Sequence, residues 1–385
     1  AKVTFVADGD TIEVDIDGDR TSRRARVRIT GIQAMELTRY SSKPSRRRGE
    51  CHAREATARL ERLIRRGRGK VRLAAQKRRS RTGSRIRRAV AVKIDGRWVD
   101  VGEVLVREGH ALWLPNSDEY AWNRRYSELA ERAAANGSRL WDRDACGGAA
   151  ASEPQLRLWA KWDADGVDGD NVNGEWAKIK NLDPSREVSL AGWWFRDSHH
   201  RRYTFPAWAK IPAGATITVR VGRGASAGDT FFWGLRKPVF ENASDDGRSM
   251  GDGAYLFDPH GDMRASMMYP CRVACADPLR DALVVTAQAS GRELVTIKNV
   301  SGSAVDLEGY QLENSPFSYD FGPRTILAPG ATLVLDVGGS AVQDTLGLKH
   351  WARIGNILND DSDVVALRNF AGTVLACDAW GAAAC

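Results

Sequence analysis

Residues 175–181 read EWAKIKN, and residues 293–299 read ELVTIKN, which is the same alternating pattern 118 positions later. Three further blocks recur at offsets of 116 or 117: residues 188–193 with 305–310, Phe205 with Phe321, and 212–216 with 329–332. Four blocks at nearly one offset indicate two consecutive copies of one unit of about 110 residues. The short strands and Gly/Pro turns in each copy predict two immunoglobulin-like β-sandwiches.

The first third of the chain follows a different pattern. Residues 1–31 alternate apolar and polar side chains between turns rich in Asp and Gly, which predicts a β-meander. The later elements expected from periodicity are a helix from about Glu50, strands at 70–75 and 88–95, and helices at 101–109 and 119–135. Five strands with a helix after the third predict an OB-type five-stranded barrel with helices.

The expected fold class is therefore mainly β with α, an OB-type barrel followed by two immunoglobulin-like β-sandwiches. A Gly/Ala-rich stretch marks the end of the barrel and is typical of a linker. The expected boundaries are 1–146 for the barrel, 147–152 for the linker, 153–278 for the first sandwich and 279–385 for the second.

Charge is distributed unevenly along the chain. Residues 1–150 carry a net charge of +14 and residues 151–385 a net charge of −6, which together give the total of +8. This asymmetry favours a polyanionic partner for the first part alone. No apolar run approaches the ~20 residues that cross a bilayer, so no membrane span is expected.

The six cysteines are even in number and fall at suggestive positions. We expect the pairs Cys51–Cys146, Cys271–Cys275 and Cys377–Cys385, which places the protein in an oxidising compartment. The expected location is extracellular, either secreted or associated with the cell surface. Six reduced and unrelated thiols are the alternative.

Four blocks in the first domain carry a family resemblance. They are DGDTIEV at 8–14, VRITGIQAMEL at 27–37, GECHAREAT at 49–57, and VDVGEVLVREGHALW at 99–113 with LWD at 140–142. Residues 1–146 thereby resemble the staphylococcal (thermonuclease) nuclease family. The repeated units resemble lamin-tail domains through E-x3-IKN, V-x-L-x-G-W/Y and PxGAT.

The nuclease resemblance implies a catalytic site. Asp10 matches a calcium ligand, Arg28 an arginine that contacts the scissile phosphate, and Glu36 the carboxylate proposed as general base. The second phosphate arginine is assigned to Arg87, with Arg85 as the alternative. Such a set suits phosphodiester hydrolysis, because cations stabilise the charge that develops on phosphorus and a carboxylate orients or deprotonates water.

The sequence departs from the family at the metal loop. Gln33 and Ala34 stand where the family has an aspartate and a threonine, so Gln33 is neutral and Ala34 offers only its backbone carbonyl. Losing a carboxylate weakens a site for a hard cation. A divalent metal ion is still expected, Ca²⁺ by resemblance, with Asp8 as a further ligand; which ion binds stays open.

A basic run surrounds the second phosphate arginine. Between Arg59 and Arg88 the chain holds fourteen Lys or Arg and a single acid. The residues expected to bind nucleic acid there are Lys77, Arg78, Arg79, Arg81, Arg85 and Arg88. Contacts to phosphate carry no sequence information, so little sequence preference is expected.

The leading hypothesis is a secreted nuclease, a phosphodiesterase acting on DNA and RNA, with residues 1–150 holding the activity and the sandwiches doing no chemistry. One alternative is a nucleic-acid-binding protein with a degenerate catalytic site. Another is a surface-anchoring adhesion protein, in which the sandwiches bind a cell-surface or matrix partner. The pair His199-His200 lacks metal-ligand spacing in sequence and is expected in an exposed turn.

Overall fold

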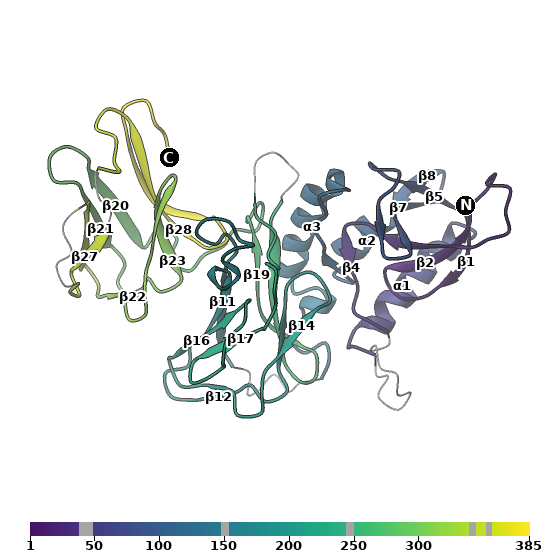
Figure 1. Ribbon diagram of the computed structural model, residues 1–385, viewed down its shortest axis with the longest axis horizontal. Coiled ribbons are helices and arrows are strands. Elements are labelled where there is room, and N and C mark those ends of the chain that lie inside the picture. The colour runs from purple at the N-terminus through teal and green to yellow at the C-terminus, as the bar shows by residue number, and fades with distance from the viewer. Residues whose placement is uncertain (38–48, 148–153, 244–249, 339–343, 352–355) are drawn as a thin grey trace. The chain divides into compact units, whose positions relative to one another are not determined.

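The computed structural model describes residues 1–37, 49–147, 154–243, 250–338, 344–351 and 356–385. Most of the predicted linker at 147–152 lies outside these ranges. The chain divides into two compact units, Ala1–Ala274 and Cys275–Cys385. The structure is mostly β with few helices (Figure 1).

One mixed sheet organises the N-terminal domain, which comprises residues 1–147. Its strands follow the order β1 (Lys2–Val6), β2 (Thr11–Asp15), β3 (Ala25–Ile29), β7 (Arg85–Ile94) and β5 (Val71–Ala74), and both β6 (Arg81–Thr82) and β8 (Arg97–Asp100) pair with β7. Strands β3 and β7 run parallel. The first and last strands of this order meet at the isolated bridge Lys2–Lys70 without a continuous ladder, so the closed barrel is not confirmed.

The helices of this domain form where apolar side chains recur at helical spacing. They are α1 (Ala53–Arg66), α2 (Val101–Arg107) and α3 (Asn123–Ala135). Helix α1 buries Leu60, Leu63 and Ile64 on one face. Helix α2 begins at an N-cap, where the Asp100 side chain accepts a hydrogen bond from the backbone N–H of Glu103. The short strands β4 (Ile32–Gln33) and β9 (Leu112–Trp113) pair beside them.

Both repeats form sandwiches with one topology, which confirms the predicted duplication. In the first repeat, one sheet has the strand order β10 (Leu156–Lys161), β11 (Trp176–Asn181), β16 (Thr216–Arg220) and β17 (Thr230–Phe232). The other sheet has the order β14 (Arg202–Thr204), β13 (Trp194–Arg196), β18 (Asp252–Phe257) and β19 (Met263–Tyr269). The short strand β12 (Val188–Ser189) pairs with β15 (Lys210–Ile211). In the second repeat, one sheet has the strand order β20 (Leu283–Gln288), β21 (Leu294–Asn299), β26 (Thr332–Val337) and β27 (Leu348–Trp351). The other sheet has the order β24 (Phe317–Asp320), β23 (Tyr310–Asn314), β28 (Asp363–Asn369) and β29 (Val374–Trp380). The short strand β22 (Val305–Asp306) pairs with β25 (Ile326–Leu327).

The ends of the repeated E-x3-IKN motif explain why it recurs. The buried Asn181 amide donates to the carbonyls of Arg186, Ile211 and Pro212. The buried Asn299 amide donates to the carbonyls of Ser303, Leu327 and Ala328 in the same way. At the other end, Glu175 accepts the N–H of Val239, and Glu293 accepts those of Ile357 and Leu358. Each motif therefore satisfies backbone groups of the surrounding loops and short strands.

Disulfides join Cys51 to Cys146 and Cys377 to Cys385, as expected. Cys271 and Cys275 are also disulfide-bonded. In the described part of the chain no free thiol remains.

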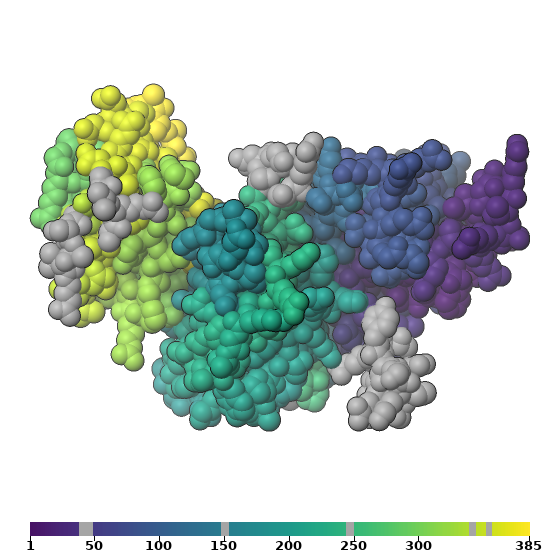
Figure 2. Space-filling model, in the orientation of Figure 1, coloured from purple at the N-terminus to yellow at the C-terminus, as the bar shows by residue number. Residues whose placement is uncertain are grey.

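The N-terminal domain and the first sandwich share one hydrophobic core. Buried side chains of the sandwich, among them Tyr255 and Phe257, belong to the same cluster as those of the N-terminal sheet and helices. Trp141 meets Tyr255 edge to face, with ring centroids 5.9 Å apart. The buried Glu131 on α3 accepts the N–H groups of Arg272, Val273 and Ala274 at 2.7–3.1 Å. In Figure 2 the teal and green residues of the first sandwich abut the blue residues of the N-terminal domain.

Replacing Asn299 by alanine should destabilise the second unit by about 1–3 kcal/mol, because three carbonyls lose their buried donor. Gln288→Ala is the matched control, since the Gln288 amide also donates to two carbonyls but is exposed. Hydrogen–deuterium exchange of peptides from residues 275–385, with denaturant titration, would measure both. Equal effects of the two substitutions would contradict this explanation of the motif.

Candidate active site

A pocket of about 450 Å³ lies between the N-terminal domain and the first sandwich. Its wall from the N-terminal domain includes Arg28, Gln33, Glu36, Arg85 and Arg87. Its wall from the sandwich includes Asp197, His199, His200 and Glu241. The sequence assigned the site to the N-terminal domain alone, whereas the structure adds the sandwich.

The three arginines of the pocket share one face because of strand pairing. Arg28 on β3 is in register with Arg87 on the parallel strand β7. Arg85 lies two residues before Arg87, and side chains two apart along a strand point the same way. Arg85 donates to the Thr11 hydroxyl at 3.3 Å, and Arg87 donates through Nε to the Thr82 hydroxyl. Both candidates for the second phosphate arginine therefore line the pocket.

Arg28 is buried, and its guanidinium makes an ion pair and two hydrogen bonds. Its guanidinium pairs with Asp10 and donates to the Ile32 carbonyl at 3.1 Å and to Gln33 Oε1 at 2.6 Å. Burial lowers the pKa of Arg28 to about 10, against the opposing effect of Asp8. The group is still charged at neutral pH.

The predicted metal ligands engage one another and Arg28. Besides the Arg28 pair, Asp10 accepts the Ala34 N–H at 2.9 Å and the Thr11 hydroxyl at 2.9 Å. The Gln33 amide nitrogen donates to the Ala34 carbonyl at 2.9 Å, the oxygen expected to bind the ion. Asp8 and Asp10 join no group of three candidate ligands among the described residues. A guanidinium thus stands where Asp10 would meet a cation, and this arrangement does not fit the Ca²⁺ site that the resemblance implies.

Tight packing explains the glycine of the DGDT turn before β2. A Cβ added at Gly9 would lie 2.7 Å from the Ala34 Cβ and 2.8 Å from the Ala56 Cβ. The turn therefore approaches both the 33–36 loop and helix α1 too closely for any side chain. This contact holds Asp10 beside Ala34.

Glu36 lies under the sandwich. Its carboxylate accepts a hydrogen bond from Gln33 Nε2 at 3.3 Å and lies 3.3 Å from His200 Nδ1. Burial raises the pKa of Glu36, and Asp8 adds to this while Arg28 opposes it. Burial, followed by the charges of Arg196 and Arg28, lowers the pKa of His200 to about 4. His200 is therefore neutral at pH 7 and can donate to Glu36 from Nδ1.

The other basic residues predicted to bind nucleic acid lie outside the pocket wall. Lys77 pairs with Asp118 at 2.6 Å, Arg88 donates to the Arg78 carbonyl at 2.9 Å, and Arg81 donates to the Ser84 carbonyl at 3.2 Å. Lys77, Arg78, Arg79 and Arg81 are exposed, so they can meet a polyanion only along the surface.

The sequence missed the contribution of the run Asp197–His200. An exposed turn was expected there, and His199 is indeed half exposed. Its ring Nδ1 lies 3.1 Å from Asp197 Oδ2, and both residues cluster with Asp252. Asp252 comes 53 positions after His199, so no local spacing could have revealed the group.

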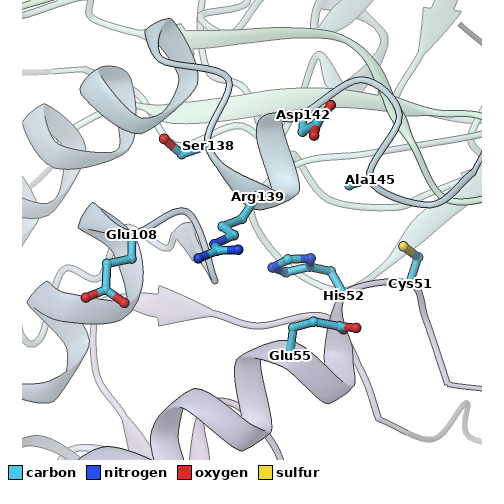
Figure 3. A pocket seen from close by; sticks show the side chains of 8 residues that line it. All are labelled: Cys51, His52, Glu55, Glu108, Ser138, Arg139, Asp142 and Ala145. Carbon is cyan, nitrogen blue, oxygen red and sulfur yellow. The ribbon is translucent and has the colours of Figure 1, made fainter.

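A second cavity of about 570 Å³ lies beside the Cys51–Cys146 disulfide. Figure 3 shows the Arg139 guanidinium between Glu108 and His52 in this view. His52 Nε2 lies 3.3 Å from Nδ1 of the buried His110. Burial is the main cause that lowers the pKa of both, that of His110 to about 4.

This histidine pair should make the first unit sensitive to acid. Because the folded pKa values lie below the unfolded value near 6.5, protonation favours the unfolded state. Stability should be complete above pH 6.5 and fall, on the order of 2 kcal/mol, as the pH drops toward 4. The variant His110→Asn keeps an acceptor for His52 and should lose less stability over that range, measured by denaturant unfolding. The exposed His260→Gln is the control; an identical pH profile for His110→Asn and the parent would refute this.

Comparison with known proteins identifies the repeats. The family model for the Lamin Tail Domain matches residues 163–270 and 280–382, more than half of the chain. No curated protein matches the chain. The matched ranges do not include residues 1–162.

Proposed function

This chain belongs to the lamin tail domain family, and we propose that it is a nuclease hydrolysing phosphodiester bonds of DNA and RNA with little sequence preference. Its N-terminal domain would be an OB-type barrel of the staphylococcal nuclease kind. One observation carries the proposal: Arg28, Arg85, Arg87 and Glu36 line a single pocket.

The arginines suit binding of the phosphate. A guanidinium has five N–H donors, and Arg85 and Arg87 each use one on a threonine hydroxyl. Their remaining donors can meet the equatorial oxygens of the phosphate, whose negative charge grows in the transition state. Arg28, already paired with Asp10, adds a third positive charge to the pocket wall.

Glu36 suits activation of the attacking water. The hydrogen bond that it accepts from Gln33 and its contact with His200 fix the direction of the carboxylate. A raised pKa makes Glu36 a stronger base than an ordinary surface glutamate. His200 then acts as a positioning residue supplied by the first sandwich.

No step of the proposed mechanism passes through a metal ion. The Arg28–Asp10 pair and the Gln33–Ala34 bond do not fit a Ca²⁺ site, so these residues are assigned no metal-binding role. The divalent cofactor implied by the family resemblance therefore takes no part in the proposed chemistry.

A nucleic-acid-binding protein with a degenerate site is the second candidate. The same Arg28–Asp10 pair favours it, because a site that lost its metal would keep its cations and bind phosphate without cutting. Incubation with a supercoiled plasmid separates the two functions: nicking supports the nuclease, while binding without nicking supports the alternative.

We also propose that the protein is secreted and acts at a cell surface or in a matrix. All six cysteines are disulfide-bonded, which supports secretion. No helix in the described part of the chain is long and apolar enough to cross a membrane. The second sandwich, a separate compact unit, would bind a partner on a cell surface or in a matrix.

Removing either main group of the site should slow hydrolysis. Arg87→Ala and Glu36→Gln should each lower the rate on a short oligonucleotide by about 10²–10³, the usual effect of losing one preorganised transition-state contact. Lys93→Ala is the charge-matched control, because Lys93 is an exposed residue on the same strand β7. Near-normal rates in both site variants, with the folded state intact, would refute the assignment.

A substitution in the sandwich should also slow the reaction. His200→Ala removes the partner of Glu36 and should lower kcat about tenfold with little change in KM, since His200 positions the base rather than the substrate. His260→Gln, an exposed histidine of the same sandwich, should leave the rate unchanged. If His200→Ala raises KM alone, His200 binds substrate instead.

A further inference from the structure

Three side chains of the first sandwich converge at the edge of the pocket. Asp197 and His199 follow strand β13, and Asp252 begins strand β18. One possible ligand atom from each lies within 4.8 Å of the other two. His199 Nδ1 and Asp197 Oδ2 are 3.1 Å apart.

Strand pairing brings these residues together. Strands β13 and β18 are antiparallel, with Phe195 opposite Leu256 and Arg196 opposite Tyr255. Continued by three residues, this register sets His199 opposite Asp252. The sheet itself, rather than a mobile loop contact, therefore fixes the spacing.

Asp252 is fully buried and only half satisfied. Its Oδ1 accepts the N–H groups of Gly253 at 2.7 Å and Ser198 at 3.3 Å. Its Oδ2 has no hydrogen-bond partner among the residues that the structure describes. A buried carboxylate oxygen without a partner costs free energy, and an orphan of this kind requires a physical reason.

The charge balance of the cluster points to the same conclusion. Asp197 is also buried, so two carboxylates stand close together away from water. Burial, then repulsion from Asp197, raises the pKa of Asp252. His199 supplies at most one positive charge, and Arg196 directs its donors at the carbonyls of Asp197 and Ser198 rather than at a carboxylate. A small cation at the cluster would relieve the repulsion and satisfy Oδ2.

We propose that Asp197, His199 and Asp252 bind one divalent transition-metal ion, with Zn²⁺ the best match. One imidazole and two carboxylates form the mixed nitrogen and oxygen set that Zn²⁺ accepts, whereas Ca²⁺ and Mg²⁺ prefer oxygen alone. Two ligands about 2.1 Å from a tetrahedral Zn²⁺ lie about 3.4 Å apart, close to the 3.1 Å between His199 and Asp197.

The site has an open side. Asp197 and His199 both line the 450 Å³ pocket, while Asp252 is buried behind them. Three protein ligands leave the fourth tetrahedral position for a water molecule or an anionic oxygen entering from the pocket. This site does not depend on the nuclease proposal, because it uses none of the arginines or Glu36.

Isothermal titration of the full, untagged chain with ZnCl₂ after EDTA treatment and dialysis tests the site. No thiolate competes, since the cysteines are in disulfides. We expect one Zn²⁺ per chain, and at least about tenfold weaker binding of Ca²⁺ and Mg²⁺. His199→Gln and Asp252→Asn should each weaken Zn²⁺ binding about 100-fold or more by removing a ligand. His260→Gln is the matched control and should bind like the parent.

Two further measurements keep the outcome decisive. Circular dichroism and thermal unfolding establish that each variant folds; if the buried Asp252→Asn fails, the half-exposed His199→Gln decides alone. The Co²⁺-loaded chain should show visible absorption bands that His199→Gln abolishes. Absence of Zn²⁺ binding by the parent chain, or unchanged binding in either folded variant, would overturn the proposal.

Discussion

The shared core between the N-terminal domain and the first sandwich is the constraint on which the site depends. Tyr255 is fully buried within a cluster that also contains the side chains of α1, α2 and α3. Separating the two parts would expose this apolar surface and leave Glu131 without the backbone N–H groups that it accepts. Because these contacts hold the first sandwich against the N-terminal domain, residues after β13 line the same pocket as Arg28 on β3 and Arg87 on β7.

This packing changes what a lamin tail sandwich contributes here. The sandwiches were expected to do no chemistry, which stays untested. The first one places His200 beside Glu36 and places Asp197 and His199 in the pocket wall. The second sandwich has the same topology and forms its own compact unit. One copy of the fold thus packs against the N-terminal domain at the proposed site, and the other forms a separate compact unit.

Local patterns in the sequence were enough for much of the fold. The E-x3-IKN repeat predicted two sandwiches, and the apolar spacing of α1 predicted its buried face. Strand β7 was expected at 88–95 and begins earlier, at Arg85, so that both Arg85 and Arg87 lie on it and line the pocket. These features depend on residues close in the chain, where periodicity carries the information.

The missed features all depend on contacts between distant residues. Arg28 on β3 pairs with Asp10 in the turn before β2, and this pair does not fit the expected Ca²⁺ site, although each residue matches the family alone. His199 meets Asp252 only because β13 pairs with β18. Closure of the predicted barrel likewise depends on pairing between its first and last strands, which in the described chain meet at the isolated bridge Lys2–Lys70 without a continuous ladder.

Comparing three lengths of the chain tests most directly whether the N-terminal domain and the first sandwich build one site. The assay measures hydrolysis of the same short oligonucleotide, at one salt concentration, by residues 1–150, by residues 1–278 and by the full chain. The 1–278 fragment keeps both Cys271 and Cys275. Circular dichroism checks that each is folded. The shared pocket predicts that 1–278 retains the full rate within about threefold, and that 1–150 loses about a hundredfold or more. A folded 1–150 that cuts as fast as the full chain would contradict it.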